Sequence, residues 1–120
     1  MPHCILEYSD NISDKPDFYK LLNNLNQKLA ETGHFKLNDI KSRAIQHNAY
    51  VIGDNDSFRA FVTLNIQILD GRTDEVKTGL SQLALDILKQ YFPETLKKNK
   101  ASLTVQITDI HRASYKREIS

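Results

Sequence analysis

The sequence predicts a single α+β domain of two layers, in which two β-α-β units form a four-stranded sheet with two helices on one face. Three observations carry this prediction. Segments of alternating apolar residues and segments with apolar residues at helical spacing occur in the order strand, helix, strand, and this order occurs twice. The two pseudo-repeats span about residues 1–55 and 56–111, with a C-terminal tail after them. The length of 120 residues fits one domain, 1–120.

The first half begins with a short strand over residues 3–8, where the character of the side chains alternates. A turn-rich connector follows, in which Ser13 or Asp14 can cap a helix whose first turn tolerates Pro16. That helix is predicted to run to about Gly33, which offers the left-handed residue that commonly closes a helix. Its apolar stripe consists of Phe18, Leu21, Leu22, Leu25 and Leu29.

A second strand is predicted within residues 40–52, which are rich in β-branched and aromatic residues. The clearest strand follows over residues 58–68, because apolar residues alternate there with mostly polar ones. Thr73 can cap the second helix, and Pro93 ends or bends it. A last strand is predicted around residues 103–108. The apolar stripe of the second helix consists of Val76, Leu80, Leu83, Ala84, Ile87, Leu88 and Tyr91.

The second face of this sheet needs a cover, because both amphipathic helices are expected to lie on the first face. Apolar residues at the alternate strand positions include Ile5, Val51 and Phe61. A partner subunit is a natural cover for such a face. We therefore expect a homo-oligomer.

Charge and composition exclude several classes of protein. The chain carries 16 Lys and Arg against 15 Asp and Glu, a formal net charge of +1, so no global field recruits nucleic acid. No window approaches the roughly 20 apolar residues of a membrane span, and no export signal is recognisable, so a cytoplasmic protein is expected. Two basic clusters are interpreted as solvated ends: Lys97, Lys98 and Lys100, then Arg112, Lys116 and Arg117.

The side chains that usually form metal or nucleophile sites lack the necessary spacing. Cys4 is the only cysteine, which excludes an internal disulfide and favours a small buried strand residue. The four histidines are scattered, with no metal-ligand motif, phosphate loop or nucleophile elbow. This pattern argues against a metal or nucleotide enzyme, and we expect no metal site.

The start of the chain offers an unusual base. Met1 stands before a small second residue and is ordinarily cleaved, which leaves the secondary amine of Pro2 as a free terminus. An α-amino group has a pKa of roughly 7.7 to 8.0, and desolvation beside positive charges lowers that pKa. Such an amine can be neutral and basic near pH 7, so Pro2 is a candidate catalytic residue.

Three segments stand in order along nearly the whole chain: residues 1–12 (Met-Pro-His-Cys-Ile-Leu-Glu-Tyr-Ser-Asp-Asn-Ile), residues 32–43 (Thr-Gly-His-Phe-Lys-Leu-Asn-Asp-Ile-Lys-Ser-Arg) and residues 71–75 (Gly-Arg-Thr-Asp-Glu). Together they resemble the 5-carboxymethyl-2-hydroxymuconate isomerases of the tautomerase superfamily. The resemblance implies the tautomerase fold, a homotrimer with active sites near subunit contacts, and an isomerase without a cofactor. It also implies a role in aromatic acid breakdown through homoprotocatechuate.

The resemblance places the functional residues of the family on four positions of this chain. The amino-terminal proline falls on Pro2, and the active-site arginine that follows a glycine falls on Arg72. The first arginine of the family's Ile-Arg-Ser-Arg segment is replaced by Lys41, and the second falls on Arg43. Lysine keeps the charge but lacks the planar fork that grips a carboxylate, so Arg43, on the same strand face, could compensate.

Three interpretations follow. In the first, Arg72, Lys41 and Arg43 hold a carboxylated dienol or unsaturated keto acid while Pro2 moves its proton, as in the muconate isomerases. In the second, the chain is a tautomerase for another small enol acid, for which Lys41 is the motivating residue. In the third, it is a non-catalytic trimeric binding protein of the same fold. The substrate, the processing of Met1 and the role of residues 111–120 stay open.

Overall fold

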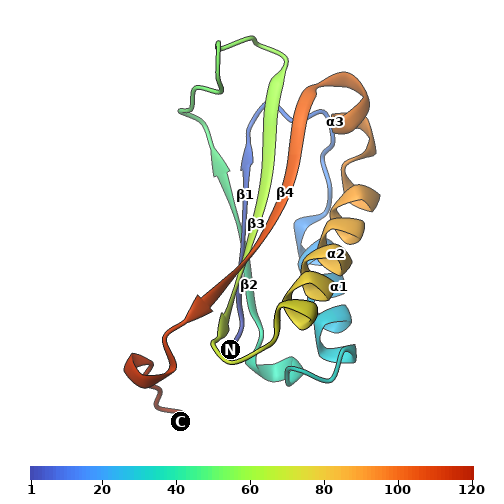
Figure 1. The fold of residues 1–120 in the computed structure, drawn as a ribbon. Coiled ribbons are helices and arrows are strands. Elements are labelled where there is room, and N and C mark those ends of the chain that lie inside the picture. Colours follow the sequence, from blue (N-terminus) through green and yellow to red (C-terminus); the bar gives the residue numbers. More distant parts are fainter.

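Two β-α-β units form one mixed sheet in the computed structural model, which describes residues 1–120 (Figure 1). The order of the strands is β2-β1-β3-β4, with β1 parallel to β2, β3 parallel to β4, and β1 antiparallel to β3. The predicted fold class is confirmed. The elements are β1 (His3–Ser9), α1 (Phe18–Glu31), β2 (Lys41–His47), β3 (Arg59–Leu69), α2 (Asp74–Tyr91), α3 (Pro93–Lys98) and β4 (Lys100–Ile110).

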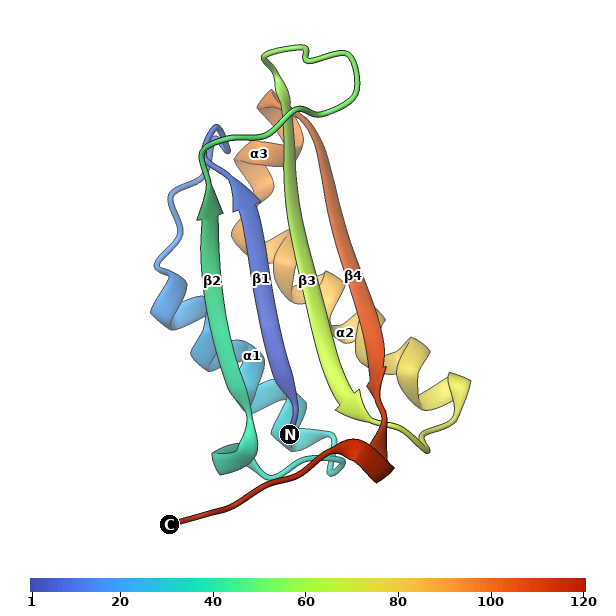
Figure 2. The same cartoon turned by 90° about the vertical axis from the view of Figure 1, so that its left-hand side faces the viewer.

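The hydrophobic core lies between the sheet and the two long helices, which cover the same face of the sheet (Figure 2). Strand β3 supplies alternate buried residues to this core, as its period of two requires. None of the helices is long and apolar enough to cross a membrane. The buried residues of β3, α1 and α2 are Ala60, Val62, Leu64, Ile66, Ile68, Leu21, Leu25, Leu29, Leu80, Ala84, Ile87 and Leu88.

The start of α1 differs from the prediction. Asp17 is its N-cap, with a side chain that accepts a hydrogen bond from the backbone of Lys20, so Pro16 precedes the helix. Asp14 instead accepts hydrogen bonds from the N–H and hydroxyl groups of Thr95, both at 2.6 Å, at the start of α3. Local spacing could not reveal this role, because the two residues are 81 positions apart in the sequence.

The second half follows its predicted elements more closely. Thr73 caps α2 by accepting a hydrogen bond from the backbone N–H of Val76 at 3.2 Å. At Pro93 the chain ends this helix and begins the short α3, where proline suits the first turn. Strand β4 is longer than predicted, whereas β2 is shorter and ends at His47.

The face of the sheet away from the helices is less apolar than the sequence predicted. Ile5 and Phe61 lie there, but Val51 belongs to a loop beyond β2 and is 74% exposed. We call this the open face. Strand alternation also places polar residues on it: Glu7, His47, Thr63, Asn65, Gln67, Ser102, Thr104 and Gln106.

Candidate active site

Three strand ends meet at one end of the sheet, and they bring Pro2 and Lys41 together. His3 pairs with Lys41 of β2 and with Gln67 of β3. The carbonyl of Pro2 also accepts a hydrogen bond from the backbone N–H of Lys41 at 3.0 Å. The parallel strands β1 and β2 begin at this end, and the antiparallel β3 finishes there (Figure 2).

The N-terminal amine lies in a partly desolvated, cationic environment. The side chain of Pro2 is buried, and the amino group of Met1 donates a hydrogen bond to the backbone carbonyl of Asp39 at 3.3 Å. Desolvation and the charge of Lys41 lower the pKa of the Met1 amine, Asp39 opposes them, and Arg117 lowers it further. An amine at this end of the chain is therefore kept neutral more easily than in water.

Lys41 and Arg43 point to the open face beside His3, as their spacing predicted. A guanidinium nitrogen of Arg43 lies 3.2 Å from Nδ1 of His3. Because arginine only donates, Nδ1 of His3 must be the unprotonated acceptor. Burial, then the charges of Arg43 and Lys41, lower the pKa of His3 in agreement with a neutral ring. His3 was not among the predicted site residues, although its position directly after Pro2 was an available signal.

Arg72 lies just beyond the end of β3, at the same end of the sheet, but it contacts a different segment. Its guanidinium donates hydrogen bonds to the carbonyls of His34 at 3.0 Å and Leu69 at 3.3 Å. It also lies over the ring of Phe35, 5.1 Å from the centroid. Arginine has five N–H donors, so three remain for a ligand. No hydrogen bond joins Arg72 to Pro2, Lys41 or Arg43.

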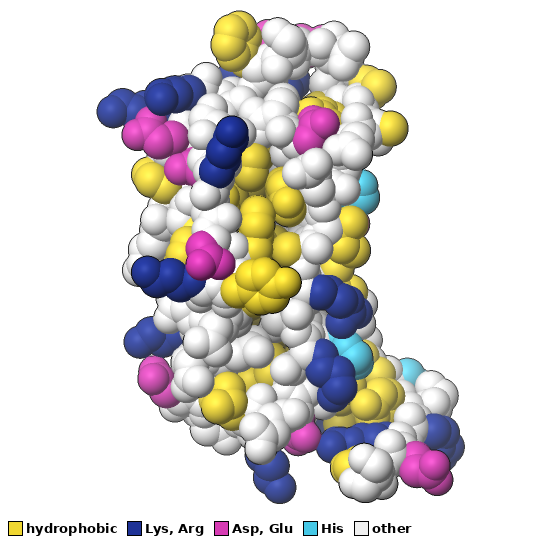
Figure 3. All heavy atoms as spheres, turned by 180° about the vertical axis from the view of Figure 1, so that it is seen from behind, with side chains coloured by type: hydrophobic (Ala, Val, Ile, Leu, Met, Phe, Trp, Pro, Cys, Tyr) yellow, Lys and Arg dark blue, Asp and Glu magenta, His cyan; other side chains and the backbone are white.

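The C-terminal tail (residues 111–120) leaves β4 at the end of the sheet where β1 starts and stays at that end. Arg117 donates to a carboxylate oxygen of Asp39 at 3.0 Å. Desolvation opposes the shift, but this hydrogen bond and the charge of Arg117 lower the pKa of the Asp39 carboxyl. An open cavity of about 550 Å³ is lined by the tail from Tyr115 to Ser120 and by His3, Asn38, Asp39 and Lys41. Figure 3 shows basic and histidine side chains gathered at this end.

Arg117 and Asp39 were also absent from the predicted site. Arg117 was predicted to belong to a solvated end of the chain, but its guanidinium forms an ion pair with Asp39. The residues stand 78 positions apart, so no local pattern links them.

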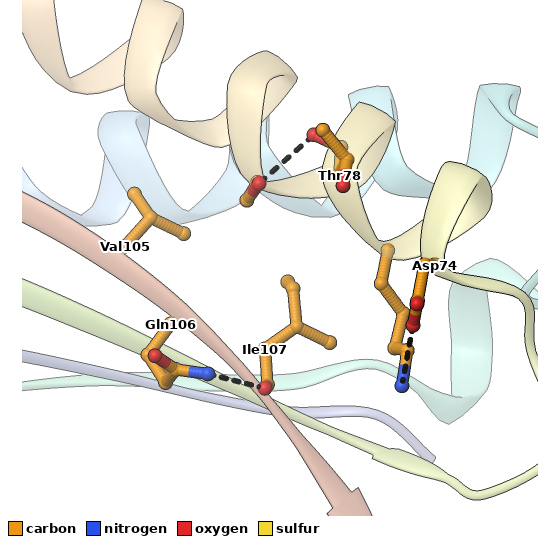
Figure 4. A pocket seen from close by; sticks show the side chains of 7 residues that line it. Asp74, Thr78, Val105, Gln106 and Ile107 are labelled. Carbon is orange, nitrogen blue, oxygen red and sulfur yellow. Dashed lines mark hydrogen bonds and ion pairs between the residues drawn. The ribbon is translucent and has the colours of Figure 1, made fainter.

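Two other hollows lie at the edges of the sheet. A groove of about 460 Å³ between α2 and β4 contains Lys77, whose ammonium pairs with Asp74 (Figure 4). The same ammonium also pairs with Asp109. Apolar side chains, among them Tyr8 and Phe18, line a groove of about 350 Å³ between α1 and β2 (Figure 3). Neither groove includes the N-terminus. No cluster of three or more His, Cys, Asp or Glu residues is placed to hold a metal ion.

Comparison with known proteins gives concordant results. A model of the 5-carboxymethyl-2-hydroxymuconate isomerase family matches residues 2–119. The 5-carboxymethyl-2-hydroxymuconate Delta-isomerase of Escherichia coli is 30% identical over 111 residues, which cover 92% of this chain and 88% of that protein. The crystal structure of a 5-carboxymethyl-2-hydroxymuconate isomerase from Deinococcus radiodurans R1 is also 30% identical, with a TM-score of 0.90 over 99% of this chain and 90% of that one.

A more distant structure shares the fold. The Q0 fused 4-OT wild-type symmetric trimer is 18% identical, with a TM-score of 0.72 over 92% of this chain and 87% of that one. At this identity the likeness concerns the fold alone.

Proposed function

The chain belongs to the 5-carboxymethyl-2-hydroxymuconate isomerase family and is an isomerase, and from this premise we propose that the amine of Pro2 moves a proton along a conjugated, carboxylated substrate. The observation that carries the proposal is the position of the N-terminus beside Lys41, in surroundings that lower the pKa of an amine. The substrate class is a dienol or unsaturated keto acid, as the name of the family suggests.

The mechanism requires the loss of Met1. While Met1 is attached, the nitrogen of Pro2 belongs to a tertiary amide, whose delocalised lone pair is not basic. Removal of Met1 makes this nitrogen the secondary amine of a new N-terminus. The new terminal amine stands one residue further along the chain than the amine of Met1. This new terminus lies beside the start of β2, because the carbonyl of Pro2 accepts a hydrogen bond from the backbone N–H of Lys41 at 3.0 Å.

The amine of Pro2 acts in both steps of the proton transfer, first as a base and then as an acid. The neutral amine of Pro2 removes a proton from the substrate and returns it to a carbon farther along the conjugated system. Negative charge develops on the dienolate oxygen in between, and preorganised cations lower the energy of that state. Lys41 and Arg43 on β2 and Arg72 after β3 would supply the cations and hold the carboxylates.

We further propose that the protein acts as a homotrimer in the breakdown of aromatic acids through homoprotocatechuate. The name of the family supports the pathway, and a structural neighbour described as a symmetric trimer supports the assembly. The open face and the unpaired edges of β2 and β4 supply surface for such contacts.

Lys41 supports a second candidate function, that of a tautomerase for another small enol acid. Its ammonium donates to the carbonyl of Asp39 at 3.3 Å, and it offers a point charge where the family pattern has an arginine fork. An ultraviolet assay of isomerisation over a panel of dienol acids would separate the candidates. Turnover of 5-carboxymethyl-2-hydroxymuconate above all others supports the first candidate, and preference for an arylpyruvate enol supports the second.

The same assay tests the role of Pro2. A Pro2→Ala variant keeps a terminal primary amine but loses the proline ring and its secondary amine, so turnover should fall while the circular dichroism spectrum stays unchanged. Turnover equal to that of the natural protein would contradict the assignment of Pro2.

A further inference from the structure

We propose that the C-terminal tail forms one wall of the substrate site and that Arg117, positioned by Asp39, binds a second carboxylate of the substrate. This inference rests on the proposed function. It assigns a specificity-determining role to the segment that the sequence left unplaced.

The exit of the tail from the sheet is fixed by Asp70, directly after β3. Its backbone N–H donates to the carbonyl of Ile110 at 3.0 Å. Its own carbonyl accepts from the guanidinium of Arg112 at 2.8 Å, and its carboxylate accepts from the backbone N–H of Arg112 at 3.3 Å. These contacts hold the tail at the end of the sheet where β1 starts and β3 and β4 finish, and Figure 2 shows the tail passing below the start of β1.

Asp39 gathers three cationic groups at that end. Its carbonyl accepts from the ammonium of Lys41 at 3.3 Å and from the amine of Met1 at 3.3 Å. Its carboxylate accepts from Arg117 at 3.0 Å. Asp39 therefore places Arg117 across from Lys41 and close to the terminus where the reacting amine is proposed to lie.

Arg117 keeps the capacity to bind an anion. Asp39 occupies one of its five N–H donors, so four remain on a side chain that lines the cavity. A planar guanidinium suits the geometry of a carboxylate, and the volume of about 550 Å³ lies within the usual range for small-molecule sites. A conjugated acid whose reacting carbon lies at the amine can thus place a second carboxylate on Arg117.

The test compares two dienol acids that differ by one carboxylate. For the acid with the additional carboxylate, Arg117→Gln should raise KM roughly 10- to 100-fold with little change in kcat, as expected for losing a hydrogen bond to a charged group. KM for the other acid should be unchanged. Asp39→Asn should have a smaller effect in the same direction, and Arg117→Lys should restore part of the binding. Lys98→Gln, which removes a charge on α3, is the matched control.

A second readout does not depend on turnover. Adipate, a saturated dicarboxylate, should shift the amide NMR signals of His3, Lys41 and the tail in the natural protein, and Arg117→Gln should weaken this binding. Equal KM changes for both acids, or adipate binding that Arg117→Gln does not alter, would overturn the inference. If the natural protein turns over no enol acid, the proposed function fails, and the adipate titration still decides the role of Arg117.

Discussion

Arg72 contacts the loop after α1 through two backbone carbonyls and the ring of Phe35. These contacts give Arg72 a structural role in addition to its proposed role in substrate binding. Arg72→Ala should lower the free energy of unfolding by about 2 kcal/mol, since it removes two hydrogen bonds that each contribute about 1 kcal/mol. It should also lower kcat/KM.

Urea unfolding and steady-state kinetics of Arg72→Ala and Arg72→Lys would separate the structural role of Arg72 from its role in substrate binding. Lysine keeps the charge but cannot reach both carbonyls with a planar fork. Unchanged kcat/KM in Arg72→Ala would restrict this residue to a structural role.

Met1 decides whether the Pro2 nitrogen can act as a base. Mass spectrometry of active protein should show a chain that begins at Pro2. A preparation that retains Met1 should turn over at least about 100-fold more slowly, because general acid–base catalysis commonly contributes 10²- to 10⁴-fold. Aminopeptidase removal of Met1 should raise turnover in proportion to the fraction cleaved. Full activity of a sample with Met1 on every chain would refute the mechanism.

At the scale of elements, Asp14 joins the connector before α1 to the start of α3. It accepts hydrogen bonds from the N–H and hydroxyl of the fully buried Thr95 and from the N–H of Glu94. Asp14→Ala should therefore cost about 2 kcal/mol, at the upper end for caps, while the more exposed cap Asp17→Ala should cost about 1 kcal/mol. Chemical denaturation of both variants checks this order, and an equal or reversed order would contradict it.

The loop before β3 makes stability depend on pH through Asp54. Hydrogen bonds from Arg59, at 2.6 and 3.1 Å, lower the pKa of the Asp54 carboxyl to about 2. Since the folded-state pKa lies below the ordinary value of 3.8, the stabilisation is present above pH 3.8 and is lost as the pH falls toward 2.

Asp54→Asn should therefore be less stable than the natural protein at pH 7, and the difference should shrink as the pH falls to 2. Denaturation at pH 7, 4 and 2 measures this difference. Asp86→Asn, at an exposed position on α2, is the control. A difference that stays constant with pH would show that the ion pair with Arg59 does not contribute.

At the scale of the whole molecule, the sheet has one face covered by helices, one open face and two unpaired edges. Ile45 lies on the open face of the edge strand β2 and is 42% exposed. Ile45→Asp should shift the protein toward smaller species in sedimentation velocity, because a charge would be buried in the proposed subunit contact. Val51→Asp, in an exposed loop, should sediment like the natural protein. A stable monomer of the natural protein at micromolar concentration would contradict the trimer.

The sequence by itself determined most of the elements and pointed to several residues of the proposed site. Apolar periodicity along β3, α1 and α2 predicted their positions because that pattern depends only on neighbouring residues. The predicted order of strands and helices also implied that Pro2 directly precedes a strand, as it does before β1, and the two-residue spacing put Lys41 and Arg43 on one face.

Only the tertiary structure decided which distant residues meet. Asp14 caps α3 across 81 positions, and Arg117 pairs with Asp39 across 78. The pairing of the strands brought polar residues of all four strands together on the open face, because register sets which residues of different strands lie side by side. Hydrogen bonds and ion pairs between distant residues form only after the sheet has brought them together, so no local pattern in the sequence encodes them.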